Sequence, residues 1–165
     1  MRKILLLSDT HSYIDDAILN HVKQVDEVWH AGDIGDLEVT DAIKKLKPLR
    51  AVYGNIDDHL ARLEFSEFNR FTCESVDVLI THIGGYPPKY NNRTIDIVKT
   101  ERPRLFICGH SHILKVMPDK ALNVLHMNPG AVGKHGFHKV RTMLKFTIDG
   151  EDIKDLHIIE FENRY

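Results

Sequence analysis

Short runs of mostly apolar residues recur along the chain, and five of them are followed within four positions by a carboxylate, amide or imidazole side chain. Runs of this length, bounded by Gly, Asp or Asn, are typical of buried strands. Ligands of open α/β sheets bind just beyond the carboxyl ends of the strands, so these residues predict a site on one rim of one sheet. The five runs are Ile4–Leu7, Glu27–His30, Leu49–Tyr53, Val76–Thr81 and Arg104–Cys108.

Between the first three runs, the apolar residues change to helical spacing. Two segments, from about Tyr13 to Lys23 and from about Leu37 to Lys47, repeat apolar residues every three or four positions. Pro48 follows the second segment and favours its end there. The resulting order of strand, helix, strand, helix, strand predicts parallel pairing in a layered α/β fold.

The second half of the chain alternates more strictly between apolar and polar residues. Leu63 to Ile80 predicts one or two strands, Gly84 to Pro88 a loop, and Asn92 to Thr100 a helix that stops before Pro103. Without a linker or repeat, the pattern predicts a single domain over residues 1–165. The remaining segments predict antiparallel strands at Ile113–Met117, Ala121–His126, Thr142–Ile148 and Asp152–Glu162.

Composition narrows the class of protein. The 165 residues are 42% hydrophobic and 28% charged, which is ordinary for a globular domain. A net charge of −2 gives no electrostatic reason to expect nucleic-acid or membrane binding, and no run approaches the roughly 18 apolar residues of a membrane span. Cys73 and Cys108 lie far apart, and Cys108 falls within an apolar run, which predicts a buried thiol. We therefore expect a cytoplasmic protein.

Seven side chains at the predicted strand ends are candidate metal ligands. Each alone has an ordinary explanation, since Asp9 could cap a helix and Asn55 could occupy a left-handed turn. Jointly they follow the same ends of the strands, and seven oxygen and nitrogen ligands suit two ions that share a carboxylate. Asp33 is the better candidate bridge, because it lies midway between the early and late ligands. The candidates are Asp9, His11, Asp33, Asn55, His82, His110 and His112.

The ordered motifs resemble those of the calcineurin-like metallophosphoesterases. They are Asp9-x-His11, Gly32-Asp33, Gly54-Asn55, His82 and Gly109-His110-x-His112. The short chain and Asn128-Pro129-Gly130 are most similar to the small bacterial and archaeal phosphodiesterase branch. The resemblance runs from Ile4 to about Gly133. It implies a two-sheet β-sandwich of mixed strands flanked by helices, a four-layer αββα arrangement.

The resemblance also implies a division of roles. Asp9, His11 and His112 would hold the first ion. Asn55, His82 and His110 would hold the second, with Asp33 as the bridge. A hydroxide between the ions would attack a small-molecule phosphate ester, most simply a diester, so Asp33 and Asn55 count as catalytic. Mixed oxygen and nitrogen ligands suit two divalent transition-metal ions, with Mn²⁺ preferred and Fe, Zn²⁺, Ni²⁺ or Co²⁺ permitted.

Two positions depart from that family. Many members have histidine directly after the Gly-Asn pair, where this chain has Ile56, so we expect weak activity on esters with poor leaving groups. Gly84 stands where relatives commonly carry another histidine. Substrate contacts are expected from Asn55, Arg93 and His135.

Two other functions fit the same fold. One is a non-catalytic interaction scaffold, which resembles the retromer subunit that has lost ligand side chains; the other is a metal-storage module. Retention of all seven ligand side chains favours the enzyme over the scaffold, and the amide of Asn55 is a weak ligand for storage. A homodimer is compatible with the exposed apolar positions of the late strands.

Overall fold

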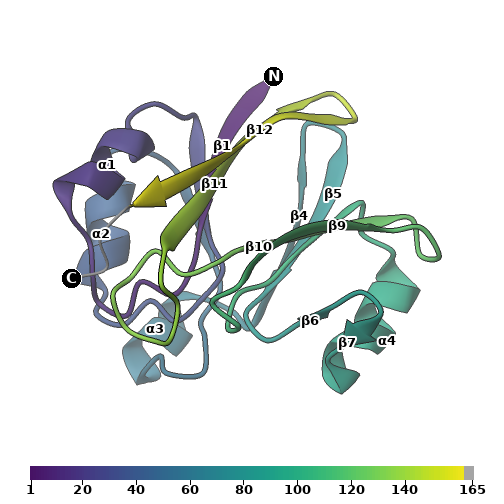
Figure 1. Cartoon of the computed structure of the whole chain (residues 1–165), viewed down its shortest axis with the longest axis horizontal. Helices are drawn as coiled ribbons and strands as arrows, with labels where there is room; N and C mark the ends of the chain where they lie inside the picture. The colour runs from purple at the N-terminus through teal and green to yellow at the C-terminus, as the bar shows by residue number, and fades with distance from the viewer. Residues whose placement is uncertain (162–165) are drawn as a thin grey trace.

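Two five-stranded sheets make up the centre of the computed structural model, which describes residues 1–161 (Figure 1). The first sheet has the order β12-β11-β1-β2-β3. Strands β1 to β3 run parallel, as predicted, and β11 pairs antiparallel with β1. Its strands are β1 (Arg2–Leu7), β2 (Glu27–His30), β3 (Leu49–Ala51), β11 (Arg141–Asp149) and β12 (Asp152–Phe161).

The second sheet has the order β4-β5-β8-β10-β9 and mixes both directions. β8 lies parallel to β5 and β10, whereas β4 and β9 close the two edges antiparallel. Its strands are β4 (Phe68–Cys73), β5 (Val76–Thr81), β8 (Leu105–Ile107), β9 (Leu114–Asp119) and β10 (Val124–Pro129).

Helices cover the outer faces of both sheets. Figure 1 shows α1 (Asp16–Val22) and α2 (Glu38–Lys44) beside the first sheet and α4 (Asn92–Glu101) beside the second. Helix α1 begins where the Asp15 side chain accepts a hydrogen bond from the Ile18 N–H, and α4 begins similarly at Asn91. A short helix, α3 (His59–Glu64), lies between β3 and β4.

The apolar runs are buried on both faces. Ile4 and Leu6 point into a core between the sheets, where they join Trp29 of β2 and Ile80 of β5. Leu5 and Leu7 point the other way and pack with residues of α1 and α2. A third cluster joins Leu79 and Phe106 to α4. Burial on both faces explains why these strands are apolar at consecutive positions, and it confirms the predicted four-layer fold.

Some boundaries differ from the predicted ones. Helix α3 was not predicted, because its six residues present only Ala61 as a buried apolar side chain. The predicted loop after Gly84 contains a small hairpin of β6 (Gly85–Tyr86) and β7 (Lys89–Tyr90). β10 pairs antiparallel with β9 as expected, but parallel with β8. The last predicted strand residue, Glu162, lies outside the described residues.

No helix within the described part of the chain is long and apolar enough to cross a membrane.

Candidate metal centre

The structure gathers the predicted ligands into two neighbouring groups, in each of which the candidate ligand atoms lie within 4.8 Å of one another. Their side chains follow β1 and β2 of the first sheet and β5 and β8 of the second. The prediction of a site on one sheet was therefore wrong: the stacked sheets bring their strand ends to a shared rim. The first group is Asp9, His11 and His112, and the second is Asp33, His82 and His110.

Each aspartate uses one carboxylate oxygen to hold its loop and turns the other toward the histidines. Asp9 Oδ2 accepts hydrogen bonds from Ser8 Oγ (2.6 Å) and the His110 N–H (3.2 Å). Asp33 Oδ1 accepts from the Ile56 N–H (3.0 Å). The remaining oxygens, Asp9 Oδ1 and Asp33 Oδ2, face imidazole nitrogens. Both carboxylates are thus oriented before any ligand binds.

Asp33 lies between the two groups. Its Oδ2 is 3.2 Å from His82 Nε2 in the second group and 3.6 Å from His11 Nε2 in the first. Asp9 is less evenly placed, since its Oδ1 is 3.1 Å from His112 Nε2 but 3.8 Å from His82 Nε2. Asp33 therefore contacts imidazoles of both groups through one oxygen.

Hydrogen bonds set the tautomers of two histidines. His82 Nδ1 donates to the Ala31 carbonyl (2.7 Å), so its Nε2 presents a lone pair toward Asp33. His138 Nε2 donates to the Gly133 carbonyl (2.8 Å), and its Nδ1 therefore accepts from His112 Nδ1 (3.2 Å). His112 Nε2 is then left unprotonated and faces Asp9. Partners of this kind orient metal-binding imidazoles and raise their basicity.

Asn55 lies beside His110 of the second group. Its Oδ1 accepts a hydrogen bond from His110 Nδ1 at 3.0 Å, and both side chains are exposed. A residue that sequence reasoning did not identify supports this loop: buried Asp57 accepts from the N–H groups of Gly54, Ile34 and Gly35. In the sequence, only its position two residues after Asn55 marks Asp57 as a candidate.

The charges of the site suit cation binding. Burial raises the pKa of Asp9 and of Asp33, but the neighbouring imidazoles of His112 and His82 respectively outweigh it, so both pKa values lie below the usual range. Burial lowers the pKa of His11 and His110. For His82, the two aspartates outweigh burial and raise the pKa. Metals bind ionised carboxylates and neutral imidazoles, and the lowered pKa values of Asp9, Asp33, His11 and His110 favour those forms.

Uncommon backbone geometry accompanies the ligands. Five of them have φ between 44° and 72°, a left-handed conformation that few non-glycine residues adopt and that clusters at functional sites. Two glycines allow close approach behind them: a Cβ on Gly54 would overlap Asp33, and one on Gly109 would overlap Ser8 and Asp9. The five are Asp9, His11, Asp33, His110 and His112.

Buried polar atoms without hydrogen-bond partners test whether a metal cation fits the site. Asp9 Oδ1, His11 Nε2 and His82 Nε2 are buried, and none has a hydrogen-bond partner of suitable geometry within residues 1–161. Leaving such groups unpaired costs free energy, so they normally have a partner. All three lie in the two ligand groups, and a cation would satisfy all three.

The predicted substrate-binding residues border the site from two sides. A cleft of about 500 Å³ opens over the ligands and is lined by His135, whose ring centroid is 4.7 Å from that of His11. Arg93 lines a separate cavity of about 330 Å³ beside Asn55 and His82. Its guanidinium is 3.0 Å from Glu67 Oε1, so an ion pair already engages it.

The calcineurin-like phosphoesterase superfamily domain matches residues 2–151. The chain belongs to that superfamily. A probable metallophosphoesterase of Methanocaldococcus jannaschii is 29% identical over 133 residues, 76% of this chain and 66% of that protein. Sequence and geometry thus lead to the same family.

Two solved structures share the fold. Vps29 of Entamoeba histolytica, complexed with zinc, superposes with a TM-score of 0.74 at 15% identity, covering 96% of this chain and 98% of that one. An archaeal phosphodiesterase gives 0.71 at 21% identity, covering 95% and 99%. At these identities the likeness concerns the fold alone.

Proposed function

We propose that the protein is a phosphodiesterase that uses two divalent transition-metal ions. The observation that carries the proposal is Asp33 Oδ2, which lies 3.2 Å from an imidazole of one ligand group and 3.6 Å from an imidazole of the other. The fold shared with an archaeal phosphodiesterase supports the diester, and the mixed donors suit Mn²⁺ first, with Fe, Zn²⁺, Ni²⁺ or Co²⁺ as alternatives.

Asp9, His11 and His112 would hold the first ion. Asn55, His82 and His110 would hold the second, with Asp33 shared. When bound, the ions activate water and neutralise charge on the phosphate oxygens. Cytoplasmic location and a homodimer remain predictions.

The chain's own residues account for orientation of the ester. The Asn55 amide is exposed beside His110 and can donate to a phosphate oxygen. His135 at the cleft and Arg93 beside it add polar or cationic groups on opposite sides of the ligands. Ile56 lines the cleft, and its hydrocarbon side chain has no proton that it could donate to the leaving oxygen.

A second candidate is a non-catalytic interaction scaffold. Its support is the apolar mouth of the cleft, where Ile56 and Ile113 are exposed and Phe137 is fully exposed. A scaffold needs no set of oriented ligands, however, and this chain retains all seven. Metal binding without hydrolysis of any phosphodiester would favour the scaffold.

The first experiment measures hydrolysis of bis(p-nitrophenyl) phosphate with added Mn²⁺. We expect metal-dependent turnover in the native chain and a fall of about 10³-fold in kcat/KM for Asp33→Ala, in the range seen when one charge-stabilising group is removed. Asp96→Ala, on the exposed face of α4, is the matched control and should retain full activity. Absence of metal-dependent turnover in the native chain would reject the proposal.

The second experiment tests the role of Ile56. Because that side chain cannot protonate a leaving group, aryl diesters should be cleaved much faster than alkyl diesters. Ile56→His should raise the alkyl rate by about 10²-fold, the lower end for a general acid, and Ile56→Ala should not. The backbone N–H that binds Asp33 is retained in both variants. Equal aryl and alkyl rates in the native chain would contradict this prediction.

A further inference from the structure

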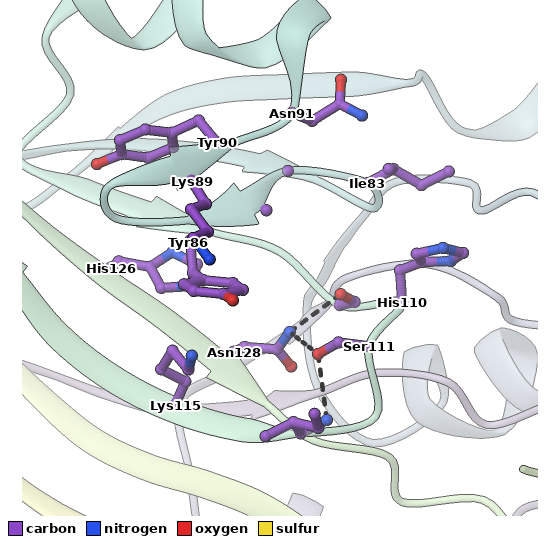
Figure 2. A pocket seen from close by; sticks show the side chains of 14 residues that line it. Ile83, Tyr86, Lys89, Tyr90, Asn91, His110, Ser111, Lys115, His126 and Asn128 are labelled. Atoms are coloured by element: carbon purple, nitrogen blue, oxygen red, sulfur yellow. Dashed lines mark hydrogen bonds between the residues drawn. The ribbon is translucent and has the colours of Figure 1, made fainter. Parts of the chain in front are cut away.

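Another cavity, distinct from the one that Arg93 lines, opens beside the metal cleft under the β6–β7 hairpin (Figure 2). We call it the hairpin pocket; the lining residues that matter here are Tyr86, Lys89, Tyr90, Ser111, Lys115 and His126. It shares His110, Ser111 and Ile113 with the cleft, so a molecule bound at the metal ligands can extend into it. Its volume of about 250 Å³ is below the roughly 300–1,000 Å³ of pockets that enclose a whole small-molecule ligand. The pocket therefore suits one portion of a ligand.

The walls of the pocket suit a planar group. Figure 2 shows Tyr86, His126 and Lys115 on one side of the pocket and His110, which also lines the cleft, on the other. Tyr86 is 38% exposed and Ile113, at the boundary with the cleft, is 62% exposed. Exposed rings and apolar side chains around a concave site gain contact area when a flat apolar group binds.

The charge of the pocket suits an anion. No carboxylate is among its lining residues, whereas Lys89 and Lys115 both are. Neither lysine forms an ion pair in the part of the chain that the structure describes, and Lys115 Nζ lies 3.5 Å from the Tyr86 ring centroid. The cavity on the other side of the ligands differs, because Arg93 there already faces Glu67.

A buried polar group completes the pocket. His126 is 1% exposed, and its Nδ1 has no hydrogen-bond partner of suitable geometry within residues 1–161. Burial lowers the pKa of His126 to about 4, so the imidazole is neutral at neutral pH. Figure 2 draws its ring among the side chains that line the pocket. A neutral nitrogen at this place can pair with a polar atom of a bound ring.

We propose that the hairpin pocket binds the organic group of the phosphate ester, and that this group is a planar ring with an anionic substituent. The ring packs against Tyr86, and the substituent lies near the Lys115 ammonium. The inference rests on the proposed function, since it places the phosphate at the metal ligands. Lys115 is then a specificity-determining residue.

Non-hydrolysable aryl phosphonates test this directly. Binding of phenylphosphonate and of the three carboxyphenylphosphonate isomers to the Mn²⁺-loaded protein is measured by calorimetry. We expect one carboxylate isomer to bind about five- to tenfold more tightly than the parent, as one hydrogen bond of typical net strength provides. Lys115→Ala should abolish that difference, Lys115→Arg should retain it, and Tyr86→Ala should weaken all four ligands.

Lys120→Ala, which removes a lysine from the turn between β9 and β10, is the control and should change nothing. Two binding results would overturn the pocket's role: no isomer binds more tightly than phenylphosphonate, or the preference survives Lys115→Ala. If the protein still hydrolyses bis(p-nitrophenyl) phosphate in that case, the proposed function stands. Selective binding without turnover of any diester supports the pocket and rejects the phosphodiesterase.

Discussion

The metal centre has a buried floor and an exposed rim, and they are held in different ways. The floor consists of Asp9, Asp33 and His82, which lie within three residues of the ends of β1, β2 and β5 and are at most 3% exposed. The rim consists of His11, His110, His112 and Asn55, which lie three to five residues after their strands and are half-buried or exposed.

Their partners show the contrast most clearly. Floor side chains bond mainly to backbone groups: His82 to the Ala31 carbonyl, Asp9 to the His110 N–H and Asp33 to the Ile56 N–H. Rim side chains bond to other loop side chains, as His112 does to His138 and His110 to Asn55. The floor therefore depends on the fold, whereas the rim depends on contacts between loops.

The largest expected difference in kcat/KM is between removal of a floor histidine and removal of a rim histidine. His82→Ala should lower kcat/KM by about 10³-fold and His110→Ala by about 10²-fold, the two ends of the range for removing one charge-stabilising group. The floor ligand has the larger effect because Asp33 loses its buried partner as well. Steady-state kinetics with bound metal counted per chain checks this, and His21→Ala in α1 controls for loss of an imidazole elsewhere. Equal losses would remove the distinction between floor and rim.

A smaller effect, on metal affinity, is expected from His138, which bonds to the rim ligand His112. His138→Ala should weaken metal binding by about 10- to 100-fold, as is typical of residues that orient a metal-binding histidine. His138→Gln should restore part of the affinity, because its amide can accept from His112 Nδ1. Titration with Mn²⁺ or Co²⁺ measures this independently of activity. His135→Ala, in the same loop, should leave metal affinity unchanged; a loss as large as that of His138→Ala would speak against the orienting role.

The last prediction concerns stability rather than activity and involves His30, which lies beneath the floor. Its Nδ1 accepts from the Gly32 N–H and its Nε2 contacts Thr10 Oγ1, and burial lowers its pKa from 6.5 to about 3. Between these values the unfolded chain binds the proton and the folded chain does not, so the contribution is complete above pH 6.5 and falls as the pH decreases. At pH 5 the loss is about 2 kcal/mol, or 1.4 kcal/mol for each pH unit below 6.5.

Denaturant unfolding in the presence of a chelator, at pH 7 and pH 5, measures the loss. The reference is His30→Asn, which cannot titrate and should show a pH dependence smaller by that amount. An identical pH dependence in the two proteins would show that the folded environment of His30 does not disfavour its charged form.

The contrast also explains what could be predicted from the sequence. Asp9, Asp33 and His82 follow buried strands, and consecutive apolar residues mark the ends of those strands. The apolar pattern alone could not predict the stacking of the sheets, because Ile4 looks the same whether its neighbour is a helix or another sheet; only the family resemblance implied it. The bond between His112 and His138 depends on loops 26 residues apart, and neither loop has a periodic pattern. Helix α3 was missed for lack of an apolar stripe.

Glycines behind the ligands affect how distant relatives can be compared. Gly54 and Gly109 have no side chain, yet a methyl group on either would occupy space that Asp33, or Ser8 and Asp9, already fill. A chain could keep all seven ligands, acquire alanine at one of these positions and lose the shape of the site. Inactive members of the superfamily could therefore arise through a backbone position, and an inventory of ligands alone would count them as enzymes.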